Sequence, residues 1–119
     1  MSKFELIIPE SLEIGYKDYK VIQAEKPVIL DNSICYGTIS YDNQEIKLDK
    51  TYKKDQLLCT LIHEVIHGID DDLNIGLDET AVELLGKGLY IFLKHNLDKL
   101  IRVIPEKISV CSEGGIING

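Results

Sequence analysis

Apolar residues at helical spacing fill the second half of the chain, and this pattern limits the possible folds more than any other feature. Between residues 53 and 69 they recur every three or four positions, which is typical of an amphipathic helix. Thr51 is the expected N-cap, and the acidic run 70–72 is expected in the polar connection that follows. The apolar series consists of Leu58, Leu61, Ile62, Val65, Ile66 and Ile69.

A second helix is predicted from Asp78 to His95 or Asn96. Residues 97–104 either continue it or form a third short helix that ends before Pro105. The connection between the two long helices is short, so we expect them to be antiparallel neighbours. The predicted apolar face of the second helix consists of Ala81, Leu84, Leu85, Gly88, Leu89 and Phe92.

The first half of the chain has the patterns of short strands rather than helices. Apolar and polar residues alternate there over short runs bounded by turn residues. The predicted strands are residues 4–8, 19–24, 34–41 and 45–49, the last two being the arms of a β-hairpin around Asp42 and Asn43.

Strands followed by helices predict an α+β fold in which a small, mainly antiparallel sheet packs against a helix pair. We expect a single domain over residues 1–119, with a strand-rich part at 1–52, a helical part at 53–104 and a flexible tail at 112–119. Ile46 and Leu48 alternate with polar residues, as in a half-buried strand near a sheet edge.

Charge and cysteine content narrow the class of partner and the compartment. The formal net charge is −7 and no basic stripe is present, so nucleic acid is not an expected partner. Three cysteines without paired short spacing favour a reducing compartment. The sequence has neither a signal-peptide pattern nor an apolar stretch of membrane-spanning length, so we expect a cytoplasmic protein with no membrane partner.

His63, Glu64 and His67 form an H-E-x-x-H pattern inside the first predicted helix. Residues four apart lie on one helix face, so the two imidazoles can point at a single zinc ion. Glu64 lies about 100° round the helix from His63, where it would reach water activated at the metal rather than the metal itself. The alternative is a chance pattern, but a helix rarely places two histidines and a glutamate beside its apolar stripe without a partner for them.

A catalytic zinc site needs a third protein ligand and one open position. Glu79 and Glu83, four apart on the second helix, share a face and would lie level with His67 and His63. Either glutamate is a possible ligand, and the alternative for both is a solvated acidic helix start. Gly86 lies on the same face and is expected to let the two helices approach closely.

Residues 60–68 (TLIHEVIHG) and 78–86 (DETAVELLG) together resemble the gluzincin metallopeptidases. The chain is most similar to the small ImmA/IrrE-like proteins of phages and bacterial mobile elements. The resemblance covers about residues 57–96, and the preceding hairpin fits the family's order of elements. It implies a minimal zincin-like fold with a zinc ion bound in the first helix.

The resemblance also implies a role for individual residues of the second helix. Glu79 takes the place of the third zinc ligand, and Glu83 that of a carboxylate accepting a hydrogen bond from the free ring nitrogen of His63. Because Asp is common at the second position, the two glutamates are also candidates for the exchanged roles. Tyr90 and His95 are the candidates on this helix for stabilising the transition state.

The residues and the resemblance together predict a zinc-dependent hydrolase that cleaves peptide bonds in a protein or peptide substrate, with Glu64 as general base. The hairpin arm Glu45–Asp49 is a candidate for pairing with an extended substrate, the alternative being an ordinary edge strand. The rival hypothesis is a zinc-binding interaction module that binds a partner protein without cutting it. The sequence indicates neither the cleavage specificity nor the oligomeric state.

Overall fold

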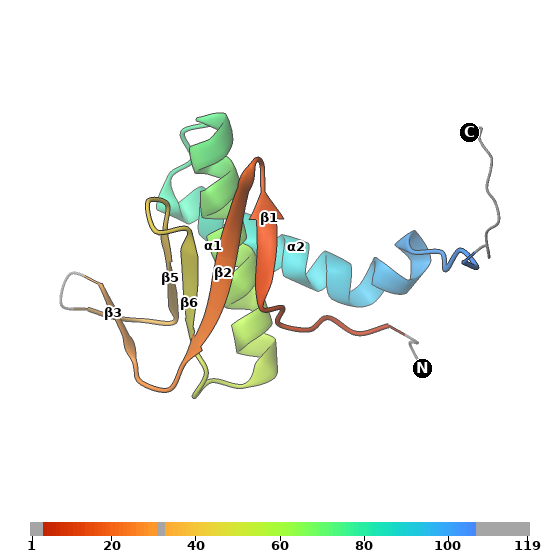
Figure 1. Ribbon diagram of the computed structural model, residues 1–119, viewed down its shortest axis with the longest axis horizontal. Helices are drawn as coiled ribbons and strands as arrows, with labels where there is room; N and C mark the ends of the chain where they lie inside the picture. Colours follow the sequence, from red (N-terminus) through yellow and green to blue (C-terminus); the bar gives the residue numbers. More distant parts are fainter. Residues whose placement is uncertain (1–3, 31–32, 107–119) are drawn as a thin grey trace.

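The chain folds into strands followed by two long helices, so the α+β prediction is confirmed (Figure 1). The structure is a computed structural model and describes residues 4–30 and 33–106. The predicted tail at residues 112–119 lies outside the described residues. The elements are β1 (Ser11–Ile14), β2 (Lys17–Ala24), β3 (Val28–Leu30), β4 (Ser33–Cys35), β5 (Gly37–Ser40), β6 (Glu45–Asp49), α1 (Lys54–Leu73) and α2 (Glu79–Leu100).

Four strands form a mixed sheet in the order β1-β2-β6-β5. The β1–β2 and β5–β6 pairs are antiparallel, whereas β2 and β6 are parallel. Parallel neighbours need a crossover, and here the chain makes it through the separate β3–β4 pair and through β5. The sheet is therefore mainly, but not wholly, antiparallel.

The predicted hairpin is confirmed as β5 and β6, but its first arm is shorter than residues 34–41 and its second arm is not the edge strand itself. β5 and β6 are antiparallel with Ile39 opposite Ile46, and Gln44 takes a left-handed conformation (φ 54°) in the turn. β6 lies between β2 and β5, so the edge strand is β5 and not Glu45–Asp49. The alternation of Ile46 and Leu48 with polar residues shows which face of a strand is covered, and it carries no information about how many of its edges are paired.

Other strand predictions also need correction. Residues 4–8 form no strand, although Tyr19 and its neighbours do lie in β2 as expected. β1 and β3 were not predicted, and β4 overlaps the predicted strand 34–41 but pairs with β3 instead of β6. β1 pairs with β2 through a tight turn that places Ser11 opposite Lys20. Strands this short form only where a neighbouring strand completes their hydrogen bonds. Their own composition gives little indication of whether such a neighbour is present.

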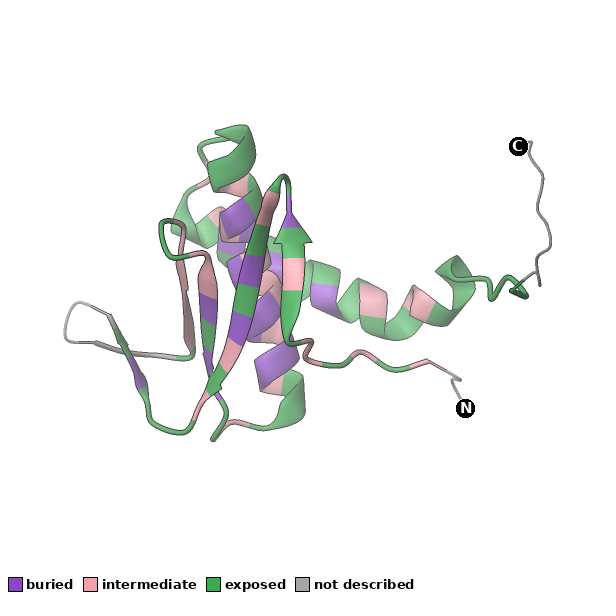
Figure 2. Ribbon diagram, viewed as in Figure 1, coloured by how far each residue is buried: buried purple, intermediate pink, exposed green. Residues whose placement is uncertain are grey.

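The molecule has three layers, in which α1 lies between the sheet and α2 (Figure 1). Buried residues cluster along the facing sides of the sheet and α1, as Figure 2 shows. Gly68 is part of this contact, because a Cβ there would lie 2.7 Å from Ile14 Cδ1. The core cluster joins Ile14, Tyr19, Val21, Ile46 and Leu48 of the sheet to Leu57 and Leu61 of α1.

α1 is longer than predicted and begins differently. It continues through the acidic run 70–72 and ends at Asn74, which takes a left-handed conformation (φ 53°). The N-cap is Lys53, which makes no side-chain capping bond. Thr51, the expected cap, instead donates its hydroxyl to Asp49 Oδ1 at 2.6 Å. Thr51 could cap a helix, but it lies two residues after the end of β6 and bonds to that strand instead.

α2 begins where predicted, with Asp78 as its N-cap accepting a hydrogen bond from the backbone N–H of Ala81 at 2.7 Å. Residues 97–100 continue the helix to Leu100, so the third short helix is not formed there. Figure 1 shows α2 crossing behind α1 and then projecting away from it, rather than lying alongside it as expected. No helix among the described residues is long and apolar enough to cross a membrane.

The predicted apolar face of α2 is wrong, since most of its large side chains are exposed. The buried residues of α2 are instead Val82, Gly86 and Tyr90, which lie four apart on one face. Apolar residues occupy most of the circumference of this helix, so its periodicity leaves open which side packs against the rest of the chain.

Candidate metal centre

His63 and His67 are positioned by α1 one turn apart on the side of the helix away from the sheet core. Their rings lie edge to face with centroids 4.9 Å apart. Both side chains are about one-fifth exposed, so they are held by packing and remain accessible from solvent. The helical prediction for this segment is confirmed, and with it the shared orientation of the two imidazoles.

Glu79 reaches the histidines because a structured turn joins the two helices. The Asp70 carboxylate oxygen Oδ1 accepts hydrogen bonds from the backbone N–H groups of Gly76 (2.7 Å) and Leu77 (3.1 Å). Gly76 has a φ of +90°, which side-chain-bearing residues rarely adopt. These hydrogen bonds fix the turn so that α2 begins next to the last turns of α1, with Glu79 as its first residue.

Close helix approach completes this arrangement, as the Gly86 prediction anticipated. A Cβ on Gly86 would lie 3.4 Å from His63 Cα, so Gly86 is packed directly on the backbone of α1. A side chain longer than alanine at this position would push the two helices apart. The expected role of Gly86 is confirmed.

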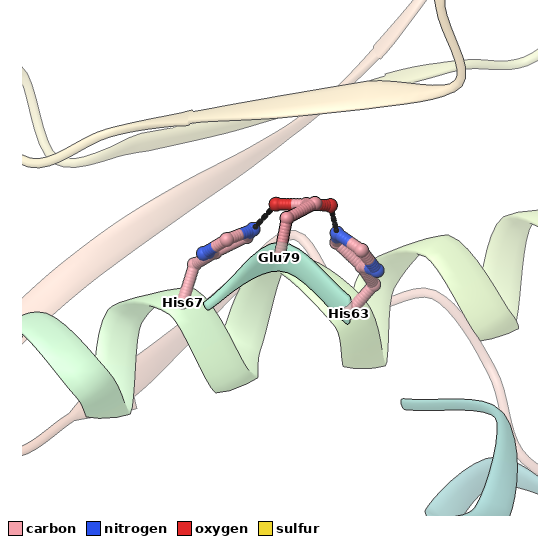
Figure 3. Close-up of side chains that lie close together, drawn as sticks. All are labelled: His63, His67 and Glu79. Carbon is pink, nitrogen blue, oxygen red and sulfur yellow. Dashed lines mark ion pairs between the residues drawn. The ribbon is translucent and has the colours of Figure 1, made fainter. Parts of the chain in front are cut away.

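The two histidines and Glu79 converge on a small region of space (Figure 3). His63 Nε2 lies 3.0 Å from one Glu79 carboxylate oxygen, and His67 Nε2 lies 3.1 Å from the other. Among the described residues these three side chains are the one group of potential metal ligands, with their ligand atoms within 4.8 Å of one another.

The geometry of this cluster fits a zinc ion. Ligand atoms about 2.0–2.1 Å from a tetrahedral ion lie about 3.3 Å from each other, close to the observed separations. Two imidazoles and one carboxylate are also a donor set that zinc accepts in catalytic sites, where a fourth position stays open. A simple ion pair at this exposed glutamate would contribute little to stability, so it does not by itself account for two histidines aimed at one carboxylate.

Glu64 lies beside the cluster but is buried, with 6% of its surface exposed. Burial, with a smaller contribution from the negative charge of Glu79, raises the pKa of its carboxyl group from 4.5 to about 7. A carboxyl group with this pKa both accepts and releases a proton near neutral pH, which is the property required of a general base that later acts as an acid.

Glu83 does not contact His63 in the way the resemblance implies. Its carboxylate forms an ion pair with Lys87 at 3.2 Å, one turn further along α2. Glu83 and Lys87 both line the cleft in front of the cluster. Of the two predicted acids, the structure therefore brings Glu79, and not Glu83, to the histidines.

Tyr90 and His95 lie away from the cluster. The Tyr90 hydroxyl donates a hydrogen bond to Asp55 Oδ1 at 2.7 Å, near the beginning of α1. Burial, followed by the interaction with Asp55, raises the pKa of Tyr90 to about 12. His95 is exposed on the projecting part of α2. Neither residue lines the cleft.

The cleft in front of the cluster is open and has a volume of about 930 Å³. One wall comes from β5 and the residues that flank it, and the other from α1 and the first turns of α2. The lining residues are Tyr36, Gly37, Thr38, Ile39, Tyr41, Tyr52, Gln56, Cys59, Thr60, His63, Glu64, His67, Glu79, Glu83 and Lys87.

Tyr41 is a cleft residue that the sequence analysis missed. Its hydroxyl donates to the backbone carbonyl of His67 at 3.4 Å, and burial followed by the charges of Asp71 and Glu64 raises its pKa. It therefore stays protonated, and its hydroxyl, on the β5 side of the site, donates its proton to the backbone of α1. The available signal was its position at the end of the hairpin's first arm, although nothing local indicates which helix turn that arm faces.

Comparisons of the chain with known protein families, with curated proteins and with solved structures give no match.

Proposed function

We propose that this protein is a zinc-dependent hydrolase, a metallopeptidase of the gluzincin type that resembles the ImmA/IrrE-like proteins. One observation carries the proposal: His63, His67 and Glu79 converge at the wall of an open cleft, with the buried carboxyl group of Glu64 beside them. A site used only for structure would need no proton acceptor of pKa about 7 at this position.

His63, His67 and Glu79 would hold the zinc ion. When bound, zinc acts as a Lewis acid that polarises a substrate carbonyl and lowers the pKa of a water molecule toward about 7. Glu64 accepts the proton of the attacking water and later delivers it to the departing amine. Burial of Glu64 supports this role because it excludes competing solvent and holds the carboxyl group at one place.

The proposed substrate is an extended peptide segment of a protein. The predicted strand pairing by Glu45–Asp49 is excluded, because both edges of β6 are already paired. The strand that pairs with the substrate is instead β5, since it is the end strand of the sheet and also lines the cleft. A peptide added to its free edge would make backbone hydrogen bonds and pass in front of the cluster. The net charge of −7 argues against nucleic acid as the substrate.

The test compares wild-type protein with Glu64→Gln, both loaded with zinc. Gln is nearly isosteric and leaves all three proposed ligands intact, so fold and zinc content should be unchanged. We expect hydrolysis to fall by at least about 10²–10⁴-fold, the usual contribution of a general base. Because the natural substrate is unidentified, new protein N-termini would be compared by mass spectrometry in cells producing each form. Glu13→Gln, at an exposed position of β1 outside the cleft lining, is the matched control.

The second candidate is a zinc-binding interaction module that binds a partner protein without cleaving it. The observation that favours it is the absence of Tyr90 and His95 from the cleft lining. This candidate gains support if wild type and Glu64→Gln give the same cellular phenotype and no cleavage product. Loss of that phenotype in His67→Ala would then show that the zinc site still matters.

A further inference from the structure

The side of α2 that faces away from α1 is apolar and exposed. We call its five central residues the outer face of α2: Leu84, Leu85, Gly88, Ile91 and Phe92. The four large side chains are each 49–64% exposed. Figure 1 shows this helix projecting beyond α1 and the sheet, and Figure 2 shows it mostly exposed along the projecting part.

The outer face is a continuous stripe and not a scatter of single exposed residues. Its members are spaced by three, four and seven positions, so they lie on one side of the helix. Gly88 is at its centre, and a Cβ placed there would meet nothing within 4 Å. The buried face formed by Val82, Gly86 and Tyr90 lies on the opposite side. The helix thus has two apolar sides, of which α1 covers one.

The apolar area of the outer face supplies most of what a dimer interface needs. Four large side chains that are about half exposed leave on the order of 400 Å² of apolar surface. A stable interface covers about 800 Å² per partner, and about 65% of that is apolar in homodimers. The outer face therefore supplies about three-quarters of the roughly 520 Å² of apolar area expected from each partner.

The distribution of charge along α2 favours a second copy of this chain in the antiparallel orientation. Acidic residues dominate its beginning (Asp78, Glu79 and Glu83), and basic residues dominate its end (Lys94, Lys99 and Arg102). Residues 78–102 contain four acidic and four basic side chains, so the whole net charge of −7 comes from the rest of the chain. Two copies therefore repel each other least at α2, and the antiparallel orientation keeps the two acidic helix beginnings far apart.

We propose that the outer face of α2 is a homodimer interface in which two α2 helices pack antiparallel about a two-fold axis at Gly88. The symmetry places Leu84 of one copy across from Phe92 of the other, and Leu85 across from Ile91. Gly88 has no side chain and lets the two helices approach closely. Glu79, Glu83 and Lys87 lie on a different side of α2, so the cleft stays open in the dimer.

Sedimentation velocity of the full chain tests this interface directly. We expect wild type to sediment as a dimer with a dissociation constant in the micromolar range or below. Phe92→Glu and Leu85→Glu each bury two charges at the axis and should give monomers, with circular dichroism and thermal melting showing whether the fold is kept. Tyr16→Glu is the matched control, since Tyr16 is fully exposed in the β1–β2 turn and should leave the dimer intact.

A cross-linking experiment tests the axis itself. Gly88→Cys should form a disulfide-linked dimer under mild oxidation, whereas Lys87→Cys, which lies on the cleft side, should not. The proposal is overturned if wild type is a monomer at every accessible concentration, or if the dimer survives in both Glu variants. It is also overturned if purified chain is monomeric while this face binds a different protein.

Discussion

The two helices of this protein are almost equal in length, yet they are used in opposite ways. α1 has 20 residues and packs on both sides, against the sheet and against α2. α2 has 22 residues and buries a single face. Seven residues of α1 are buried, including the polar Thr60 and Glu64, whereas only Val82, Gly86 and Tyr90 are buried in α2.

The difference shows how one helix can position most of a candidate site while its neighbour contributes a single side chain to it. Because α1 is enclosed, its side chains are held in place and Glu64 is removed from water, which raises its pKa. α2 contributes Glu79 from its first turn and then leaves the body of the protein (Figure 1). Its remaining apolar surface is therefore available for another molecule.

The largest expected effect concerns zinc binding by the proposed ligands, two from α1 and one from α2. We expect one zinc ion per chain, and more than about 100-fold weaker binding in His63→Ala or His67→Ala, since changes to groups that merely orient a ligand already cost 10–100-fold. Glu79→Ala should weaken zinc binding more than Glu83→Ala, because Glu79 is the acid that contacts both imidazoles. Competition with a chelator measures all four variants. The reverse order for the two glutamates would exchange their roles.

Next in size is the effect of shortening a leucine on each helix. Leu61 of α1 is buried in the core, so Leu61→Ala should lower the free energy of unfolding by about 2–5 kcal/mol. Leu85 of α2 is about half exposed, and Leu85→Ala should cost the monomer less than about 1 kcal/mol. Urea denaturation at low protein concentration, where monomers dominate, measures both. Equal losses would mean that the outer face of α2 is buried within one chain.

A smaller effect comes from the pH dependence of stability in metal-free protein. The pKa of Glu64 is about 7 in the folded chain and 4.5 in the reference state, so the folded state binds the proton more tightly. The contribution of Glu64 to the free energy of unfolding is therefore complete below about pH 4.5. It is lost as the pH rises toward 7, by about 1–3 kcal/mol.

Comparing variants isolates this contribution from other titrating groups. Glu64→Gln should remove that part of the slope, whereas Glu83→Gln on the exposed face of α2 should keep it. Denaturation midpoints measured from pH 4 to 8 in the presence of a chelator give the comparison. A wild-type slope identical to that of Glu64→Gln would show that the pKa of Glu64 is not raised in the folded chain.

The smallest expected effects concern how the two helices begin. Asp78 caps α2 with a 2.7 Å bond to the N–H of Ala81, and Asp78→Ala should cost about 0.5–2 kcal/mol. Lys53 at the start of α1 makes no such bond, so Lys53→Asp should stabilise the protein by a few tenths to about 1 kcal/mol. Thermal melting of both variants measures the difference. A stabilising Asp78→Ala would contradict the role of the cap.

Several features of the site were predictable because they depend on spacing within one element. His63 and His67 share a face in any α-helix, and the apolar series around them predicted that helix. Gly86 against His63 followed from two helices that must pack closely. The β5–β6 hairpin followed from two alternating runs around a short turn.

The choice of Glu79 over Glu83 was open from the residues alone, and it is decided by how the inter-helix turn is built. Asp70 holds Gly76 and Leu77 so that the first residue of α2, and not its fifth, faces the histidines. The sequence shows an acidic run there, and it does not show which member bonds to the turn. Tyr41 was missed for the same reason, because its neighbour His67 is 26 residues away.

What the sequence determined by itself was therefore the local arrangement: two helices, a hairpin, and the histidine pair with Glu64 beside it. Tertiary structure alone decided which strand is the sheet edge, which side of α2 is buried, and which acid completes the cluster. The physical reason is that periodicity records whether a residue meets an apolar surface, while the identity of that surface depends on how separate elements pack. In α2, where apolar residues surround most of the helix, only contact with α1 distinguishes the buried side from the outer face.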